Sequence, residues 1–187
     1  GVGLGVFRGD EQDVLGRFSG AAKAYNAKTI VRVCADNPLV DPVEIDRLVD
    51  FFWRNQPADY VCNDRLDCGL PDGVGAEIGS AECLNRLDGV VPLPMREHVF
   101  QYVTQNLGDF SIGRLEATGP LNRPEIRLDI DHPEDGEFIS GLMELMDSNK
   151  GPYWSTLDVI QAVDLNPGLL ELRRDMAGSE SVGLSHG

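Results

Sequence analysis

The chain has 187 residues, of which 42% are apolar, and its formal net charge is −15. This length is typical of one globular domain with a sizeable core. The acidic balance excludes a basic nucleic-acid surface and disfavours an anionic membrane surface, and the sequence has no apolar run of the ~18 residues that a membrane-spanning helix needs.

The cysteines and histidines predict neither a zinc site nor disulfides. The four cysteines contain no C-x-x-C pair, and the three histidines are scattered. Free thiols are typical of a reducing compartment, so we expect a cytoplasmic protein. The cysteines are Cys34, Cys62, Cys68 and Cys83, and the histidines are His98, His132 and His186.

The first segment predicts a short strand and a helix. Gly1–Gly5 is rich in glycine but does not lie between a strand and a helix, so it is a very weak dinucleotide-binding signal. Gly5–Arg8 predicts a strand, and Asp10 can cap a helix that runs to about Ala27. Apolar residues recur at helical spacing along that helix.

The next segment, 28–42, places a carboxylate just beyond a strand. Thr29–Cys34 is β-branched and predicts a buried strand, and Asp36 follows it. The proline after Asn37 forces a turn, and Asp41 can cap a helix that begins at Pro42 and runs to about Asn55. Ligands of open α/β sheets bind at the carboxyl ends of strands. The alternative is that Asp36 only caps a turn.

The middle of the chain continues the α/β pattern and then breaks it. Ala58–Cys62 predicts a second core strand, so the order strand, helix, strand, helix, strand favours a layered α/β sheet with parallel strands. A polar loop over 63–75 then includes a turn at Leu70–Gly73. Four further elements are expected: a strand at Gly75–Gly79, a helix capped by Ser80 to about Leu87, a helix at Pro94–Asn106 and a strand at Phe110–Ala117.

The last third repeats the strand-end carboxylate. Glu125–Asp131 alternates as a half-exposed strand does, with Asp129 and Asp131 on one face, and Pro133 starts a helix. Magnesium is typically held by one or two carboxylates plus substrate phosphates, so Asp36 and Asp131 could share an ion. The alternative is a turn with helix-capping acids. A last helix is expected at Ser155–Val163, and the small, polar residues 177–187 predict a disordered tail after a domain over 1–176.

Several motifs in order resemble the cytidylyltransferases of spore-coat polysaccharide biosynthesis, relatives of the acylneuraminate and ketodeoxyoctonate cytidylyltransferases. The resemblance extends from about Gly5 to about Glu171. It rests on the ordered set rather than on any single motif. The motifs are Val6–Gly9, Asp13–Arg17, Val31–Pro42, Pro71–Gly73, Glu77, Arg96–Val99 and Asp131–Asp135.

The resemblance implies a glycosyltransferase-A-like (Rossmann-like) three-layer fold with a mixed, mostly parallel sheet. It also implies transfer of a cytidylyl group from CTP to an acidic sugar for surface polysaccharide biosynthesis, with Mg²⁺ and with Asp36 and Asp131 as the metal-binding and catalytic residues. The family's opening strand and basic, glycine-containing nucleotide loop have no match here. We therefore expect the sheet to lack its first strand and the domain to be incomplete at its N-terminus.

The resemblance further implies substrate contacts and self-association. The implied substrate-binding residues are Arg8, Asp72, Gly73, Glu77, Arg96, Glu97 and His98. The plainer alternatives are a surface ion pair for Arg8, an ordinary turn at Asp72–Gly73 and a solvated helix start at Arg96–His98. A homodimer is expected through segments around 70–100. Two alternatives to this function are a non-catalytic interaction domain of the same fold and a transferase that uses another nucleotide.

Overall fold

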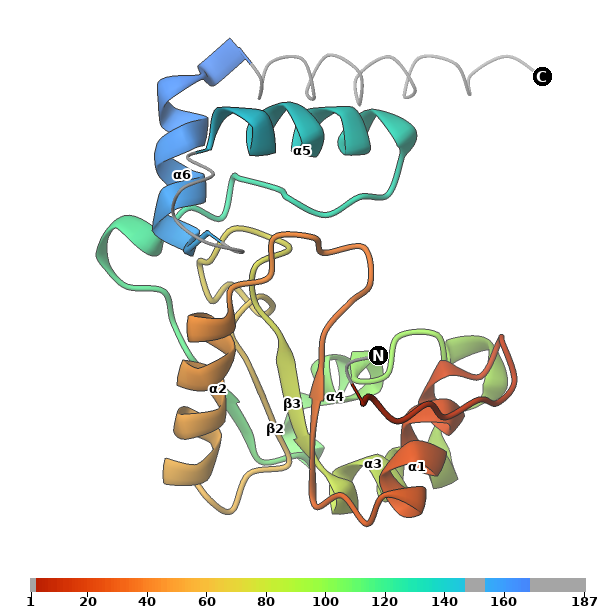
Figure 1. The fold of residues 1–187 in the computed structure, drawn as a ribbon. Coiled ribbons are helices and arrows are strands. Elements are labelled where there is room, and N and C mark those ends of the chain that lie inside the picture. The colour runs from red at the N-terminus through yellow and green to blue at the C-terminus, as the bar shows by residue number, and fades with distance from the viewer. Residues whose placement is uncertain (1–2, 147–153, 169–187) are drawn as a thin grey trace, which may run out of the picture.

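The structure is a computed structural model that describes residues 3–146 and 154–168 (Figure 1). The helices are α1 Val14–Ala24, α2 Pro42–Arg54, α3 Ala81–Val90, α4 Gln101–Gln105, α5 Pro133–Leu145 and α6 Thr156–Leu165. The strands are β1 Thr29–Arg32, β2 Tyr60–Cys62, β3 Glu77–Ser80 and β4 Ile112–Arg114. Short 3-10 turns lie at Leu93–Met95, Leu107–Asp109 and Gly119–Leu121. No helix of the described part is both long enough and apolar enough to cross a membrane.

The strands form one mixed sheet in the order β1-β3-β2-β4. β3 runs antiparallel to β1 and to β2, and β4 runs parallel to β2, so β1, β2 and β4 share one direction. Their carboxyl ends therefore meet at one edge of the sheet, where β3 begins. In the register, Arg32 faces Glu77, Glu77 faces Cys62, and Cys62 faces Arg114. The loops that follow β1 and β2 leave from this edge.

Helices cover both faces of the sheet, which confirms the predicted three-layer α/β fold (Figure 1). α2 packs Leu48 and Phe52 against Val61 and Ile78 on one face. The other face is covered by α1, α3 and α4. A third apolar cluster joins α5 and α6 to Ile126 and Leu128 beyond the carboxyl edge of the sheet. Glycine is required at Gly79 in β3, because a Cβ atom there would lie 2.6 Å from the Phe100 ring.

The N-terminal strand predicted at Gly5–Arg8 is absent, and that prediction was wrong. Val6 is 72% exposed, and none of these residues joins the sheet. A lone strand is unstable without a neighbour to take its backbone hydrogen bonds, and β1 pairs with β3 alone among the described strands. The first helix is capped by Asp13 rather than Asp10, since the Asp13 carboxylate accepts the Gly16 N–H at 2.7 Å.

Two later elements also differ from the sequence predictions. The helix expected over 94–106 is split into a 3-10 turn and the short α4, because the buried Arg96 between them accepts the Leu15 N–H on its carbonyl. Residues 125–131 form no strand and make one isolated parallel bridge, between Arg127 and Asp72. The predicted alternation holds from Ile126 to Leu128, which are buried on either side of the exposed Arg127, and ends at Asp129, which is buried as well. The tail predicted at 177–187 lies outside the described residues.

The cap at Asp41, confirmed as predicted, also joins two parts of the chain. Its buried carboxylate accepts the Val43 N–H of α2 at 2.9 Å, and the N–H and hydroxyl of Thr156 at the start of α6 at 2.7 and 2.8 Å. The substitution Asp41→Ala leaves these donors without an acceptor. We expect it to lower the free energy of unfolding by about 2–4 kcal/mol, measured by urea denaturation.

Asp50→Ala is the matched control. Asp50 lies on the same helix in an exposed pair with Arg54, and its removal should change the free energy of unfolding by less than about 0.5 kcal/mol. Equal effects of the two substitutions would contradict the role of Asp41.

Candidate functional site

Two loops carrying the predicted metal-binding residues meet beyond the carboxyl edge of the sheet. The Ile130 N–H donates to the Asp36 carbonyl at 2.9 Å, which places the residue before Asp131 against Asp36. The side chains of Asp36 and Asp131 are both exposed. The distance between their two carboxylates stays a prediction.

These two residues fit a magnesium ion better than a metal held by protein alone. No group of three or more His, Cys, Asp or Glu side chains in the described residues could enclose a metal. Mg²⁺ commonly keeps several waters and takes one or two carboxylates together with substrate phosphates. Two exposed carboxylates on adjoining loops match that requirement.

Arg127 links the residues around Asp131. Its guanidinium donates to the buried Asp129, and to Asp131 at 3.1 Å, and its Nε lies 3.7 Å from the Asp72 carboxylate. The hydrogen bond to Asp129 raises the pKa of Arg127. Burial, together with the nearby Asp129 carboxylate, raises the pKa of Asp72. Asp129 and Asp131, which the alternation of 125–131 predicts on one face, both contact this guanidinium.

Asp72 and Gly73 hold the 125–131 segment in place. The Asp72 N–H donates to the Ile126 carbonyl, and the Leu128 N–H donates to the Asp72 carbonyl, each at 2.9 Å. Gly73 has a φ of +93°, and a Cβ atom there would lie 2.9 Å from the Asp129 nitrogen. A side chain at position 73 is therefore excluded both by the backbone conformation and by the close approach of the other chain segment.

Glu77 and His98 line a second part of the site, a cavity of about 250 Å³. The Glu77 carboxylate is fixed, because it accepts the Tyr60 hydroxyl at 2.6 Å and the Arg32 guanidinium at 2.5 Å. Burial and the adjacent Glu77 carboxylate raise the pKa of Tyr60. The lining residues are Arg32, Arg65, Glu77, His98, Phe100, Gln101 and Thr104.

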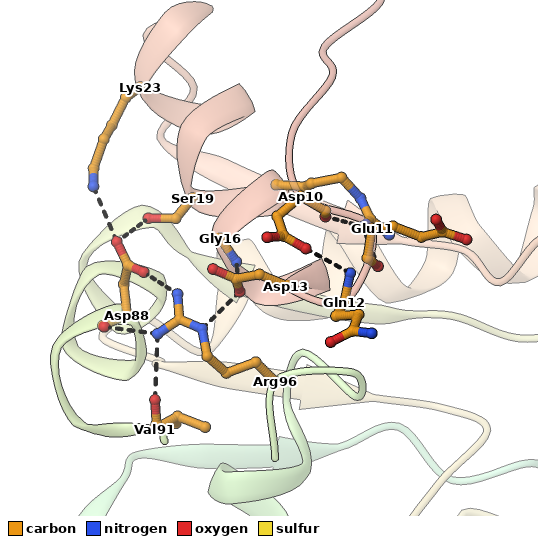
Figure 2. Close-up of polar contacts among 11 residues, drawn as sticks. Asp10, Glu11, Gln12, Asp13, Gly16, Ser19, Lys23, Asp88, Val91 and Arg96 are labelled. Carbon is orange, nitrogen blue, oxygen red and sulfur yellow. Dashed lines mark hydrogen bonds and ion pairs between the residues drawn. The ribbon is translucent and has the colours of Figure 1, made fainter. Parts of the chain in front are cut away.

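Arg96 and Glu97 lie apart from this cavity. Arg96 is 7% exposed, and its guanidinium donates to the carboxylates of Asp13 and Asp88 and to the carbonyls of Asp88 and Val91 (Figure 2). It joins the start of α1 to the end of α3. Glu97 lines a different cleft, of about 650 Å³, that includes Asp10 and Glu11.

The predicted substrate-binding residues thus fall into separate groups. Asp72 and Gly73 lie against the segment that leads to Asp131, whereas Glu77 and His98 share the smaller cavity. Arg8 is exposed in a segment without regular secondary structure. Their contacts with substrate stay predictions.

Sequence reasoning missed Asp64 and Arg65, which follow β2 as Asp36 follows β1. Ligands of open α/β sheets bind beyond the carboxyl ends of strands. This rule, applied to β2 as it was to β1, would have found both residues, because the two strands end at the same edge. One oxygen of Asp64, Oδ1, is buried without a hydrogen-bond partner in the described part of the chain. Burial and the neighbouring Glu77 carboxylate raise the pKa of Asp64 to about 6.

Comparisons with known proteins agree with the fold and the sequence motifs. The model of the family described as "Cytidylyltransferase" matches residues 1–152. The chain is 30% identical over 168 residues to the spore coat polysaccharide biosynthesis protein SpsF of Bacillus subtilis, covering 88% of this chain and 67% of that protein. It resembles the structure of a cytidylyltransferase from Leptospira borgpetersenii with a TM-score of 0.79 and 32% identity, over 89% of this chain and 68% of that one.

The chain spans less than two thirds of the length of a third similar protein. An uncharacterized protein of Methanocaldococcus jannaschii is 35% identical over 147 residues, which make up 78% of this chain. The match spans 58% of the length of that relative.

Asp64 makes stability depend on pH in a specific direction. Its folded pKa of about 6 lies above the ordinary aspartate pKa of 3.8, so between about pH 4 and pH 6 the folded state binds more protons than the unfolded state. Stability from this group is therefore present below about pH 4 and is lost as the pH rises through 6. We expect Asp64→Asn to be about 1–3 kcal/mol more stable than the wild type at pH 7.5, and about equally stable at pH 4.

The measurement is urea denaturation of both proteins across this range, reported as the difference between them so that other titrating groups cancel. Asp67→Asn, an exposed aspartate in the same loop, is the control. A difference that does not change with pH would contradict the burial of an unsatisfied carboxylate at Asp64.

Proposed function

The chain belongs to the cytidylyltransferase family, and from this premise we propose that it transfers a cytidylyl group from CTP to an acidic sugar for surface polysaccharide biosynthesis. The observation that carries the proposal is the contact between the Asp36 and Asp131 loops at the carboxyl edge of the sheet. The Bacillus relative is named for spore coat polysaccharide biosynthesis, which supports the proposed class of product.

In the proposed reaction, a hydroxyl group of the sugar attacks the α-phosphorus of CTP. The new oxygen–phosphorus bond replaces the bond to pyrophosphate, which leaves, and the hydroxyl proton is released to a base or to water. Asp36 and Asp131 would hold Mg²⁺, which orients the phosphates and neutralises their charge when it is bound. Arg127 holds Asp131 from one side through a 3.1 Å hydrogen bond. The same guanidinium also binds the buried Asp129. This second ion pair fixes the position of Arg127, so that Arg127 can in turn hold the Asp131 carboxylate in place.

The smaller cavity is proposed as the site of the acceptor sugar. Its polar walls offer hydrogen-bonding groups, among them His98 and Gln101. A volume of about 250 Å³ suits a single sugar better than a nucleoside triphosphate. In the proposed complex, the sugar hydroxyl lies within hydrogen-bonding distance of His98, which acts as its general base.

The proposed metal site is tested with Asp36→Asn and Asp131→Asn in the full-length natural protein. Each substitution removes a negative charge while it preserves size. CTP binding is titrated calorimetrically with and without Mg²⁺. We expect the wild type to bind CTP more tightly with Mg²⁺, and each variant to lose at least about tenfold of that Mg²⁺-dependent gain.

The matched control is Asp46→Asn, an exposed aspartate on α2, which should titrate as the wild type does. If both site variants keep the full Mg²⁺-dependent gain, the assignment of Asp36 and Asp131 is refuted.

We also propose a homodimer that uses the 70–100 region. Val90, Leu93 and Met95 expose apolar side chains there, at 58%, 69% and 36%. A stable interface should bury at least about 1,000 Å² in total. Leu93→Asp is expected to shift the mass measured by light scattering from dimer to monomer, whereas Val43→Asp, at a 61% exposed position on α2, should leave it unchanged. A wild type that is monomeric at high concentration would contradict this proposal.

A further inference from the structure

Two of the buried cysteines lie next to each other. Cys62 is the last residue of β2, and Cys68 follows the 63–67 loop. Their Sγ atoms lie 3.8 Å apart, the residues are 0% and 3% exposed, and both are free thiols. The sulfur–sulfur bond of a disulfide is about 2.05 Å long, so the two sulfurs would need to approach by about 1.8 Å. Small changes in the side-chain torsion angles can supply that movement.

The backbone keeps the two cysteines side by side. The Cys62 carbonyl accepts the Leu115 N–H at 2.9 Å, and the Cys68 carbonyl accepts the Ala117 N–H at 2.7 Å. Both residues are therefore bound to the same segment, which follows β4. The Cys68 N–H also donates to the Arg65 carbonyl at 3.2 Å, within the loop. The contact between the two sulfurs thus follows from fixed backbone positions.

The 63–67 loop reverses direction through a strained backbone. Leu66 and Asp67 have φ values of +54° and +58°, in the left-handed region that costs free energy for residues other than glycine. Arg65 and Asp67 are exposed. A short, exposed and strained loop opens locally at a lower cost than the strands do. A molecule as small as hydrogen peroxide can then reach the sulfur of Cys68.

The two thiols differ in reactivity. The hydrogen bond from Cys62 lowers the pKa of the Cys68 thiol, whereas the same contact, together with burial, raises the pKa of Cys62. The thiolate is the form that reacts with oxidants. Cys68 is therefore the thiol that is oxidised first. Cys83, which is buried on α3, shows the opposite case, because burial raises the pKa of its thiol to about 12.

We infer that Cys62 and Cys68 are a site of reversible oxidation, at which a hydroperoxide forms a disulfide that closes the 63–67 loop. A thiol reductant restores the pair. Arg65, which lines the smaller cavity, lies in this loop, so the oxidation state of the pair determines how freely this part of the cavity wall can move. The inference goes beyond the proposed transfer reaction and does not depend on it.

The oxidation has two steps. The Cys68 thiolate attacks one oxygen of hydrogen peroxide; a sulfur–oxygen bond forms, the oxygen–oxygen bond breaks, and hydroxide leaves a sulfenic acid on Cys68. The Cys62 sulfur then attacks the Cys68 sulfur. The sulfur–sulfur bond replaces the sulfur–oxygen bond, and water leaves with the proton of the Cys62 thiol. In total, two thiols and one peroxide give one disulfide and two water molecules, and the two sulfurs lose the two electrons that the peroxide gains.

The test is differential labelling of the full-length natural protein after treatment with hydrogen peroxide. Free thiols are blocked with iodoacetamide, disulfides are reduced, and the released thiols take isotopically heavy iodoacetamide. Trypsin then places Cys62 on peptide 55–65, and Cys68 and Cys83 on peptide 66–86, where fragmentation distinguishes them. We expect equal heavy label on Cys62 and Cys68 and light label on Cys83. Dithiothreitol added before the blocking step should return the pair to light label.

Serine variants assign the two roles. Cys62→Ser keeps a hydrogen-bond donor but removes the second sulfur, so Cys68 should stop at the sulfenic acid, which dimedone captures. Cys68→Ser should leave Cys62 at least about tenfold less reactive with peroxide than Cys68 is in the wild type. Cys83→Ala is the matched control at an equally buried thiol and should form the disulfide as the wild type does.

Native proteolysis measures the closure of the loop. A protease binds its substrate extended, and a disulfide between Cys62 and Cys68 holds the two ends of this segment together. Trypsin should therefore cut after Arg65 at least about tenfold more slowly in the oxidised wild type than in the reduced one, and peroxide should not change this rate in Cys68→Ser.

The labelling of the wild type decides the inference even if a serine variant does not fold. Heavy label on only one of Cys62 and Cys68, or as much on Cys83 as on Cys68, would overturn it. Oxidation of Cys68 to a sulfinic acid without a disulfide would overturn it as well. Equal rates of cleavage after Arg65 in the oxidised and reduced wild type would refute the closure of the loop.

Discussion

The ion pair between Arg32 and Glu77 is the constraint on which the candidate site depends. Both side chains are largely buried, at 14% and 7% exposure, and they face each other across β1 and β3 at the edge where the parallel strands end. Breaking such a pair would leave a charge without compensation. The Tyr60 hydroxyl from β2 occupies the other oxygen of Glu77. One carboxylate therefore connects three neighbouring strands and forms part of the cavity wall.

The loops beyond that edge are held by backbone contacts rather than by a continued sheet. Asp72 and the 125–131 segment exchange two hydrogen bonds, and Ile130 then reaches Asp36. Gly73 permits the close approach because it has no side chain. The Arg127 guanidinium contacts the carboxylates of Asp72, Asp129 and Asp131 in the same region. The chain can thus keep several acidic groups close together around the Arg127 guanidinium, in a protein whose net charge is strongly negative.

Arg96 belongs to one of the motifs shared with the family, but its contacts in the structure stabilise the fold. Its guanidinium joins Asp13 and Asp88, from segments far apart in the sequence, and the hydrogen bond to Asp13 raises its pKa (Figure 2). Its neighbour His98 lines the cavity of Glu77, and Glu97 lines another cleft. Three consecutive residues therefore face three environments, although they are neighbours in one motif.

The sequence by itself determined most of the secondary structure and the edge of the sheet at which to look. β-branched runs, the Asp41–Pro42 helix start and the Ser80 cap act locally, so they could be read without neighbours. Only the tertiary structure decided that residues 5–8 stay out of the sheet and that 125–131 is extended without a full strand partner. It also decided that Arg65 lines the smaller cavity and that one oxygen of Asp64 is buried. Strand pairing, burial of a carboxylate and the meeting of two loops depend on segments distant in sequence, and local patterns carry no information about which distant segment will supply the partner.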